Sequence, residues 1–355
     1  MQNRSFSRRD LLEFSTASAV ATVFAAPLRA AAAETTAVDQ ALIQAARKEG
    51  VVAFYTAMEI PVAETLAKAF QARYPGIAVR VKRSGAERVF QRIGKEEEIR
   101  LYEVDVVCST DAAHFVRWKR EGWLAPFLPQ DAAAYLPAEQ VDADGMYATA
   151  FALLSPIGYN TNLVKPEDAP KSFADLLAPK WKGKIVKANP GYSGVILTAT
   201  FELARDLGWA YFEKLAQQQV TQVQSAYDPP QRLAHGESAI QADGAESDLL
   251  LLKEQGAPVE AVYATEGTPL ITAPSAVFQS APNPNAARLF QSFLFSADAQ
   301  QLLIDDSGLC SFHALVREKP GRRSLSDIKL MKADPVAMAA QSEEIKARYS
   351  RLFGV

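Results

Sequence analysis

Hydrophobic and polar positions alternate along residues 38–110 in a repeating order of helix and strand. Amphipathic helical patterns precede three short apolar runs, Val51–Tyr55, Ile77–Val81 and Val104–Val107, each of which is typical of a buried strand. Gly and Pro residues end the first two helical patterns. Strands that alternate with helices in this way predict a parallel sheet with right-handed crossover connections. We therefore expect the chain to begin as an α/β structure.

Two later segments, Tyr147–Asn162 and Tyr263–Phe278, are apolar, extended in character and interrupted by prolines. Helix and strand patterns precede, separate and follow them, so the chain is predicted to leave one lobe, build a second and return. We expect lobe 1 to comprise residues 34–152 and 268–315, lobe 2 residues 153–267, and residues 316–355 to form C-terminal helices on the lobes. Ligand pockets favour domain interfaces, so the cleft between the lobes is the predicted site.

Composition and charge narrow the functional classes. A chain of 355 residues exceeds one typical core, which agrees with two lobes. The net charge of −3 gives no reason to expect nucleic acid or an anionic membrane as a partner. The cysteines, Cys108 and Cys310, and three separated histidines cannot form a zinc-type cluster from neighbouring residues. We predict no metal and no cofactor, and two unpaired thiols.

The first 33 residues have the pattern of an export signal. Ser7–Leu12 (SRRDLL) resembles the twin-arginine motif, an apolar stretch follows over 14–27, and Ala30–Ala33 offers a cleavage site. An ordinary secretory signal and an uncleaved membrane anchor are the alternatives, although the apolar stretch is shorter than the roughly 20 residues of a membrane span. Residues 1–33 carry four arginines against Asp10 and Glu13, so the rest of the chain has a net charge of −5. We expect a periplasmic protein.

Each of the first three strands ends in a small polar loop. Open α/β sheets bind ligands beyond the carboxyl ends of their strands, and each loop also begins a helix, whose N-terminus favours an anion. Ordinary N-capping would explain each loop singly, and that alternative stays open. The loop residues that we predict to bind a ligand are Thr56, Ser84, Gly85, Ser109 and Thr110.

A fourth polar loop, residues 188–194 (ANPGYSG), separates a short strand from a long helical pattern. Gly194 permits close backbone approach and Ser193 stands at the expected helix start. The loop lacks the Gly-Lys-Ser/Thr ending of a nucleotide-binding loop and is not a Gly-x-Ser-x-Gly nucleophile elbow. We predict that Tyr192, Ser193 and Gly194 bind the ligand, with a purely structural loop as the alternative.

Several short segments, taken in order, carry a resemblance to a known family. They are Phe54–Ala57, Ser84–Gly85, Asp105–Val107, Ile157–Thr161, Trp181–Ile185 and Gly236–Glu237. Together they resemble the periplasmic substrate-binding proteins of ABC importers, in the branch related to ferric-iron-binding proteins. The resemblance covers essentially the whole mature chain. It implies a type II periplasmic-binding-protein fold of two α/β lobes with two interlobe crossovers, which closes over a solute without chemistry and delivers it to the permease subunits in the inner membrane.

The chain departs from the iron binders of this branch at one place. Those proteins hold Fe³⁺ with an adjacent tyrosine pair, whereas the counterpart here, residues 240–247 (IQADGAES), contains no tyrosine. Other relatives resemble binders of phosphorylated sugars and organophosphorus solutes, which use acidic side chains for hydroxyls and helix N-termini for phosphate. Tyr227, Asp228, Asp243 and Glu246 suit that pattern. A helix cap at Asp228 and solvent-facing acids at the other two positions are the alternatives.

These observations predict the extracytoplasmic solute-binding component of an ABC importer. We expect a monomer that captures a small anionic solute (phosphorylated, phosphonate or carboxylate), with Arg83 and Arg88 adding charge-assisted contacts. A ferric-iron-binding transport protein is the alternative. An enzyme on the same fold would need a nucleophile–base pair, such as Ser193 or Cys310 with His235, and nothing in the sequence places these together.

Overall fold

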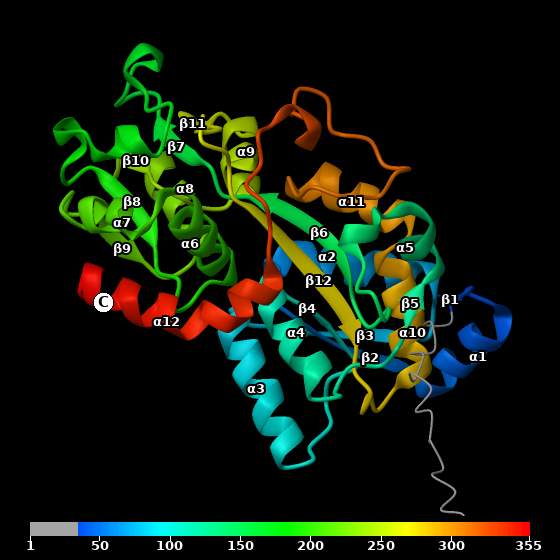
Figure 1. Cartoon of the computed structure of the whole chain (residues 1–355). Helices are drawn as coiled ribbons and strands as arrows, with labels where there is room; N and C mark the ends of the chain where they lie inside the picture. Colours follow the sequence, from blue (N-terminus) through cyan, green and yellow to red (C-terminus); the bar gives the residue numbers. More distant parts are fainter. Residues whose placement is uncertain (1–34) are drawn as a thin grey trace, which may run out of the picture. The chain divides into compact units, whose positions relative to one another are not determined.

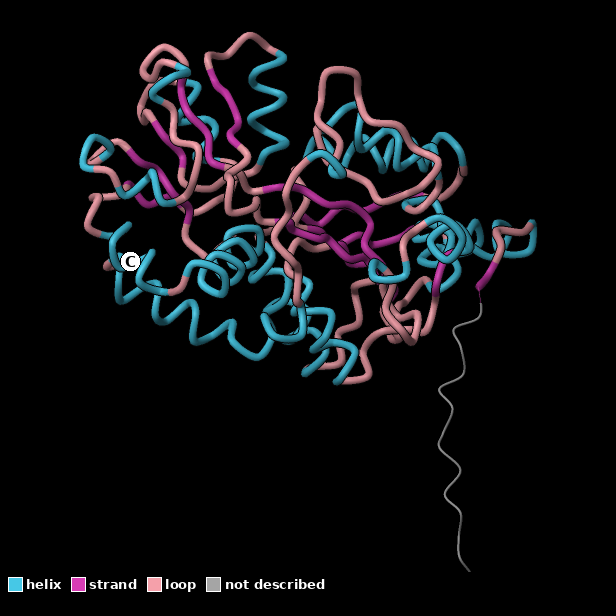
Figure 2. Tube along the Cα trace, turned by 45° about the horizontal axis from the view of Figure 1, so that its top comes forward, coloured by secondary structure: helices cyan, strands magenta, loops and turns pink. Residues whose placement is uncertain are grey.

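The computed structural model describes residues 35–355, and the predicted export signal lies outside them. Most described strands belong to two five-stranded sheets, with helices around each (Figures 1 and 2). The first sheet, in the order β3–β2–β4–β12–β6, has the bounds Ala78–Arg83, Val51–Thr56, Val106–Cys108, Leu270–Val277 and Ala148–Leu154. The second, β11–β7–β10–β8–β9, has the bounds Val259–Val262, Ile157–Asn160, Ile240–Gln241, Ile185–Ala188 and Thr221–Val223. The short strands β1 (Thr35–Thr36) and β5 (Leu128–Pro129) pair separately.

Twelve α-helices connect and cover the strands in the described part of the chain. Those before the second sheet begins are α1 (Gln40–Glu49), α2 (Ile60–Arg73), α3 (Ala86–Glu98), α4 (Ala112–Arg120) and α5 (Gln130–Tyr135). The next four are α6 (Gly194–Leu207), α7 (Trp209–Ala216), α8 (Asp228–Ala234) and α9 (Glu246–Glu254). The last three are α10 (Pro284–Leu294), α11 (Ala297–Ser307) and α12 (Pro335–Phe353). The α/β fold class and the alternation read from the first hundred residues are thus confirmed.

The first sheet is mixed rather than wholly parallel. Strand β2 is parallel to both β3 and β4, as the helix–strand alternation predicts. Strand β12 is antiparallel to β4 and to β6, because it belongs to the segment that returns from the second sheet. The alternation of helices and strands predicts only strands that are joined by helical crossovers. It therefore did not predict the antiparallel pairing of β12 with β4 and with β6.

Two connections join the sheets, and they leave the first sheet side by side. Strand β6 ends at Leu154 and β7 begins at Ile157, so only Ser155 and Pro156 lie between them. The chain returns between the end of β11 and the start of β12 at Leu270. Leu154 and Leu270 are paired residues in the antiparallel β6–β12 ladder. Both apolar, proline-interrupted segments of the sequence therefore pass from one sheet to the other.

Each sheet has its own aromatic core. Beside the first sheet, the ring of Phe290 packs edge-on against Phe54 and Phe70, with 5.0 Å between ring centroids in each pair. Beside the second, Phe212 and Tyr349 are buried together, and Tyr349 belongs to α12. Helix α12 packs against α4, α6 and α7. The C-terminal helix therefore contacts helices associated with both sheets.

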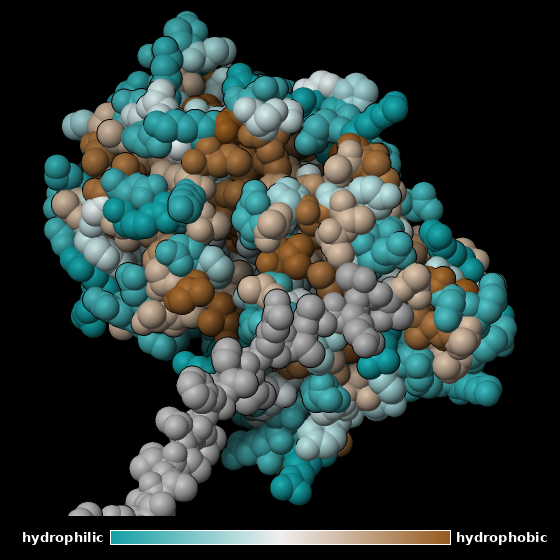
Figure 3. Space-filling model, turned by 45° about the vertical axis from the view of Figure 1, so that its right-hand side comes forward, coloured by the Kyte–Doolittle hydropathy of each residue, from teal (hydrophilic) through white to brown (hydrophobic). Residues whose placement is uncertain are grey.

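The remaining sequence features are simple to place. Both cysteines are free thiols, with Cys108 buried in β4 and Cys310 half-buried. Among residues 35–355, no helix combines the length and the apolar character needed to cross a membrane. The face in Figure 3 is largely hydrophilic, and its hydrophobic side chains gather in recesses, as burial of apolar surface requires.

Candidate functional site

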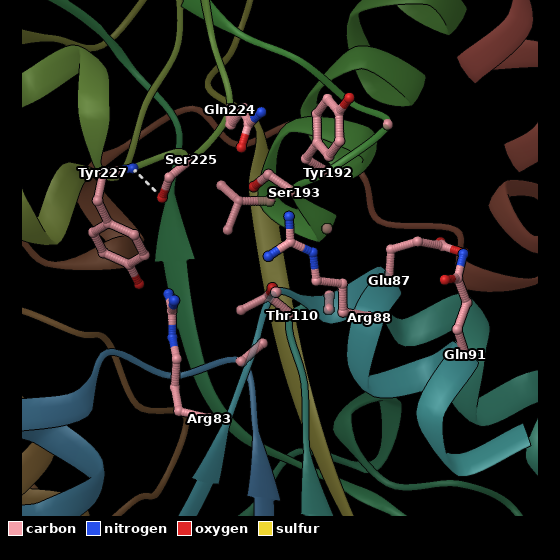
Figure 4. Close-up of a pocket in the computed structure, with 16 residues that line it drawn as sticks. Arg83, Glu87, Arg88, Gln91, Thr110, Tyr192, Ser193, Gln224, Ser225 and Tyr227 are labelled. Carbon is pink, nitrogen blue, oxygen red and sulfur yellow. Dashed lines mark hydrogen bonds between the residues drawn. The ribbon is translucent and has the colours of Figure 1, made fainter. Parts of the chain in front are cut away.

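A cavity of about 290 Å³ lies where four polar loops meet. Two of the loops follow strands β3 and β4 of the first sheet, and two follow strands β8 and β9 of the second; Ala57, directly after β2, adds one more lining residue. Its lining comprises Ala57, Arg83, Gly85, Ala86, Glu87, Arg88, Gln91, Thr110, Gly191, Tyr192, Ser193, Gly194, Val195, Gln224, Ser225 and Tyr227 (Figure 4). The carboxyl ends of parallel strands supply all four loops, which is where α/β sheets place their ligand sites.

Two helix N-termini reach this cavity without side-chain caps. The N-cap residue of α3 is Gly85, which has no side chain to cap the helix, and that of α6 is Ser193, whose side chain makes no capping hydrogen bond. The first turn of any α-helix leaves its backbone N–H groups without intrahelical partners. Helix α4 differs, because Oδ1 of Asp111 accepts a hydrogen bond from Ala113 N–H at 3.0 Å. Helices α3 and α6 therefore offer free N–H groups and the positive ends of their dipoles to the cavity.

Glycine allows these helix ends to approach one another. A Cβ atom on Gly194 would lie 2.9 Å from Cβ of Asp111 and 3.1 Å from Cβ of Ala86. A Cβ atom on Gly85 would lie 3.2 Å from the carbonyl oxygen of Tyr192. Larger residues at Gly194 would have to move the start of α6 away from α3 and α4. The close approach of α6 to both helices thus depends on Gly194.

Two arginines bring positive charge to the cavity. The Arg83 guanidinium contacts Glu59, with 2.5 Å between Nη2 and Oε1, and donates from Nε to the Met58 carbonyl at 3.3 Å. Arg88 is exposed and takes part in no salt bridge of residues 35–355. Figure 4 shows Arg88 extending from α3 toward Ser193, and the Tyr227 hydroxyl pointing toward Arg83. The charge of Arg88 is available to a ligand.

One acid lines the same cavity, and its charge is already compensated. Glu87 lies 3.7 Å from Nε2 of His114 and 2.8 Å from Nζ of Lys346 on α12. His114, and then Lys346, hold the pKa of the Glu87 carboxyl down at about 2, despite partial burial. The cavity therefore has local positive character although the mature chain is net negative.

The structure brings half of the predicted ligand-binding residues to this cavity. They are Gly85, Thr110, Tyr192, Ser193, Gly194 and Tyr227. Three more lie in adjoining loops but do not line it. Thr56 is buried and its Oγ1 accepts a hydrogen bond from Met58 N–H at 3.0 Å, Ser109 is buried, and Ser84 is half-buried. Their part in binding stays a prediction.

The predicted acids lie elsewhere. Asp228 lines a neighbouring cavity and accepts a hydrogen bond from Ser225 N–H at 3.0 Å. Asp243 is buried in an ion pair with Lys187. Glu246 is buried and accepts a hydrogen bond from the Tyr263 hydroxyl; burial raises the pKa of the Glu246 carboxyl to about 7. Neither Asp243 nor Glu246 lines either cavity. The alternative interpretation expected both acids to face solvent, whereas both are buried.

The polar lining residues that were missed are Glu87 and Gln91 of α3, together with Gln224 and Ser225. Gln224 and Ser225 follow β9, a three-residue strand at the edge of the second sheet that is parallel to β8. Its sequence, Thr-Gln-Val, has too little apolar character to be recognised as a strand. The rule that ligands bind after parallel strands would have found this loop once the strand was known.

The first comparison is with protein families. The model of the bacterial extracellular solute-binding protein family matches residues 65–321. Among curated proteins, a probable ABC transporter periplasmic-binding protein of Sinorhizobium fredii is 24% identical over 64% of this chain. A candidate 2-aminoethylphosphonate-binding periplasmic protein of Salmonella paratyphi A is 31% identical over 39% of it. The chain spans 65% of the length of the first relative and 40% of the second.

The second comparison is with solved structures. The periplasmic binding protein AfuA from Actinobacillus pleuropneumoniae, with fructose 6-phosphate bound, is 22% identical with a TM-score of 0.78. The match covers 86% of this chain and 99% of AfuA. Iron-bound HitA from Pseudomonas aeruginosa is 20% identical with a TM-score of 0.74, covering 84% of this chain and 99% of HitA. The predicted type II periplasmic-binding-protein fold is confirmed.

Proposed function

Because the chain belongs to the bacterial extracellular solute-binding protein family, we propose that it is the solute-capturing component of an ABC importer and that its solute carries an anionic group. The anionic group, a phosphate, phosphonate or carboxylate, binds in the cavity lined by Arg88 and Ser193. The observation that carries this assignment is the pair of uncapped N-termini, of α3 and α6, at one cavity.

The binding chemistry follows from the groups at the cavity. Backbone N–H groups of the first turns donate to the anion, and they need no counter-charge of their own. Arg88 supplies a charge-assisted contact, and the Ser193 hydroxyl, which does not cap α6, is free to donate another hydrogen bond. Glu87 opposes the anion little, because Lys346 compensates its charge from 2.8 Å.

The protein acts as a carrier in this proposal, without chemistry on the solute. Ser193 lines the cavity, but neither Cys310 nor His235 does, and His235 is an exposed residue at the end of α8. Neither pair that the sequence offered, Ser193 with His235 or Cys310 with His235, is therefore assembled at this cavity of the described chain. The partners are the permease subunits in the inner membrane. The protein works in the periplasm as a monomer, and the Arg8–Arg9 motif directs export by the twin-arginine route.

The test is a ligand screen followed by titration of variants. Thermal shift would rank fructose 6-phosphate, alkyl- and aminoalkylphosphonates, and small carboxylates against fructose as a neutral control. Calorimetry would then compare Arg88→Gln and Ser193→Ala with Arg80→Gln, an exposed arginine of β3 that lines neither cavity. Loss of one hydrogen bond to a charged group costs about 1.5–3 kcal/mol, so each site variant should lose about tenfold or more in affinity. A neutral or cationic best ligand, or unchanged affinity in both site variants, contradicts the proposal.

Ferric iron is the second candidate, since Tyr192 and Tyr227 line the same cavity. They come from different loops and are not the adjacent pair of the iron binders. Burial raises the pKa of the Tyr227 hydroxyl, which opposes a phenolate. Addition of ferric citrate should produce no phenolate-to-iron absorption band. A visible band that disappears in Tyr192→Phe or Tyr227→Phe would favour iron instead.

A further inference from the structure

A buried histidine lies beside the helix starts that form the proposed anion cavity. His114 of α4 is 7% exposed, and its ring stacks on Phe90 of α3 with 4.2 Å between ring centroids. Nε2 of His114 lies 3.2 Å from Oδ2 of Asp111 and 3.7 Å from Oε2 of Glu87. Nδ1 is buried and has no hydrogen-bond partner in the described chain. Because Nε2 faces two carboxylates, it carries the hydrogen of the neutral ring, and a second proton would go to Nδ1.

The two carboxylates that face His114 differ in their other partners. Glu87 has Nζ of Lys346 at 2.8 Å. Asp111 forms no salt bridge with any lysine or arginine within residues 35–355, and its other partner is the neutral Ala113 N–H at the start of α4. Asp111 therefore has a cationic partner only when His114 is protonated. Burial opposes that charge on the ring, whereas two carboxylates within 4 Å favour it.

Asp111 lies next to a helix start that the anion would bind. A Cβ atom on Gly194, the first residue of α6, would lie 2.9 Å from Cβ of Asp111. Thr110, the preceding residue, lines the cavity, whereas the Asp111 side chain does not and is 3% exposed. An anion at the N-terminus of α6 would thus lie near a buried carboxylate, which repels it unless a charged His114 compensates that carboxylate.

The other charged groups around this ring hold their charges between about pH 5 and pH 8, the range in which histidine titrates. Lys346 of α12 contacts both Glu87 and Glu343, at 2.8 and 2.9 Å. Arg117, one turn further along α4, lies 5.3 Å from the centroid of the Phe90 ring. The pKa of Glu87 is about 2, and lysine and arginine stay protonated throughout this range. His114 is therefore the group of this cluster whose charge can respond to the anion.

We propose that His114 makes anion capture proton-linked: an anion at the starts of α3 and α6 draws a proton from solvent onto His114, and the imidazolium then compensates Asp111. The inference rests on the proposed anion site. His114 does not line the cavity, so it is a positioning residue that acts through Asp111 and Glu87. Affinity for the anion falls as pH rises, because loss of the proton leaves Asp111 to repel the anion.

Calorimetry with glycolate and methylphosphonate would test this inference against His114→Gln. At about pH 5 wild type should bind about threefold to tenfold more tightly than the variant, and near pH 8 the two should bind equally. Glu202, Glu246 and Asp248 titrate in the same range, but they are common to both proteins and cancel in this ratio. His235→Gln, at an exposed histidine of the second sheet's helices, is the matched control and should follow wild type at every pH.

Asp111→Asn gives a second test with the opposite sign. Asparagine keeps a cap acceptor for Ala113 N–H, so α4 should still form. Near pH 8 this variant should bind the anion about threefold to tenfold more tightly than wild type, and near pH 5 the two should differ little. If His114→Gln does not fold, this variant decides alone: a ratio to wild type that is the same at both pH values overturns the inference.

Proton uptake on binding is the direct readout. Titration in the middle of this pH range, in two buffers of different ionisation enthalpy, gives the number of protons taken up with each anion. Wild type should take up more than His114→Gln, and the difference cancels any proton that the anion itself exchanges. Equal uptake with binding intact, or a loss of affinity in His114→Gln that is the same at every pH, overturns the proton linkage and leaves the anion site standing. If neither anion binds to wild type, the proposed function fails together with this inference.

Discussion

Lys187 of β8 and Asp243 form an ion pair beside the second sheet, with 2.5 Å between Nζ and Oδ2 and 1% of each side chain exposed. Burial raises the pKa of Asp243 and lowers the pKa of Lys187, so each group depends on the other to stay charged. Asp243→Ala would leave a buried ammonium group without an anionic partner, with only the Ala188 carbonyl to accept from it. We expect the free energy of unfolding, measured by urea denaturation, to fall by about 3–5 kcal/mol.

The double variant Lys187→Met/Asp243→Leu is the control, because replacing both charges by apolar groups is often neutral for stability. It should recover most of the loss. An Asp243→Asn protein that unfolds like the wild type but no longer binds the anion would contradict this structural role. Asp243 would then be a ligand group, as the sequence predicts.

Glu202 of α6 predicts a pH dependence of stability. It is fully buried, and its Oε2 accepts a hydrogen bond from Leu270 N–H at 3.0 Å. Burial raises the pKa of this carboxyl to about 8, against 4.5 for an unperturbed glutamate. Between these pH values the unfolded chain is ionised while the folded chain holds the proton. The group therefore costs nothing below about pH 4.5, destabilises the fold increasingly between about pH 4.5 and pH 8, and adds no further cost above that.

Glu202→Gln keeps the acceptor for Leu270 and removes the titration. Relative to wild type, its melting temperature should rise progressively between pH 5 and pH 8. Burial also raises the pKa of Glu246 and Asp248, so these groups add their own pH dependence to both proteins. The quantity to follow is therefore the difference in melting temperature between Glu202→Gln and wild type at each pH. Glu64→Gln, an exposed carboxyl of α2, should show no such trend. If the melting temperatures of Glu202→Gln and wild type differed by the same amount at every pH, the titration of Glu202 would not affect stability.

Gly194 should be intolerant of a side chain. A Cβ atom would lie within 3.1 Å of atoms of Asp111, Thr110 and Ala86, which includes the Thr110 carbonyl. We expect Gly194→Ala to lower the free energy of unfolding by about 1–3 kcal/mol through overpacking, and to weaken anion binding by displacing the α6 N-terminus. Gly94→Ala in α3 is the matched control, because nothing lies within 4 Å of its new methyl group. That variant should gain about 0.5–1 kcal/mol. Equal stability of the two variants would refute the packing argument.

The two inter-sheet connections predict lobe closure. Leu154 and Leu270 are paired where both connections leave the first sheet, so a rotation about 154–158 and 265–270 would move the second sheet as a unit. Small-angle scattering with saturating anion should give a smaller radius of gyration than without it. Gly194→Ala, which should bind the anion more weakly, is the control at the same anion concentration. A decrease in radius that is equally large in this variant would be an effect of salt and not of binding. An unchanged radius with calorimetrically confirmed binding would exclude closure about these residues.

Local signals in the sequence were enough for most of the elements, and half of the predicted binding residues line the cavity. Apolar periodicity and Gly or Pro punctuation located β2, β3, β8 and the long helices, and polar loops after strands located Ser193 and Thr110. The acids show where such reasoning fails. Asp228 and Asp243 are both predicted from the sequence to bind the ligand, yet Asp243 pairs with a buried lysine and Asp228 lines a neighbouring cavity. Only tertiary packing distinguishes them, because Lys187 lies far from Asp243 in the chain.

Lys346 of α12 should control the charge of the anion cavity from outside its lining. Its Nζ lies 2.8 Å from Oε2 of Glu87, which lines the cavity at the start of α3. The low pKa of Glu87, about 2, keeps this carboxylate charged at every pH at which the protein would be studied. Lys346→Met would remove the cation that compensates the Glu87 carboxylate. His114 would be its remaining contact. We expect several-fold weaker binding of methylphosphonate by calorimetry, most clearly at low ionic strength.

Glu87→Gln should have the opposite effect, because it removes the negative charge at the cavity and leaves Lys346 paired only with Glu343, which is 85% exposed. Lys332→Met, an exposed lysine ahead of α12 that forms no salt bridge in the described residues, is the charge-matched control. The double variant Glu87→Gln/Lys346→Met should bind methylphosphonate close to wild-type affinity, since both charges are removed together. If Lys346→Met and Glu87→Gln shift the affinity in the same direction, the effect is a displacement of α3 and not the compensation of charge at the cavity.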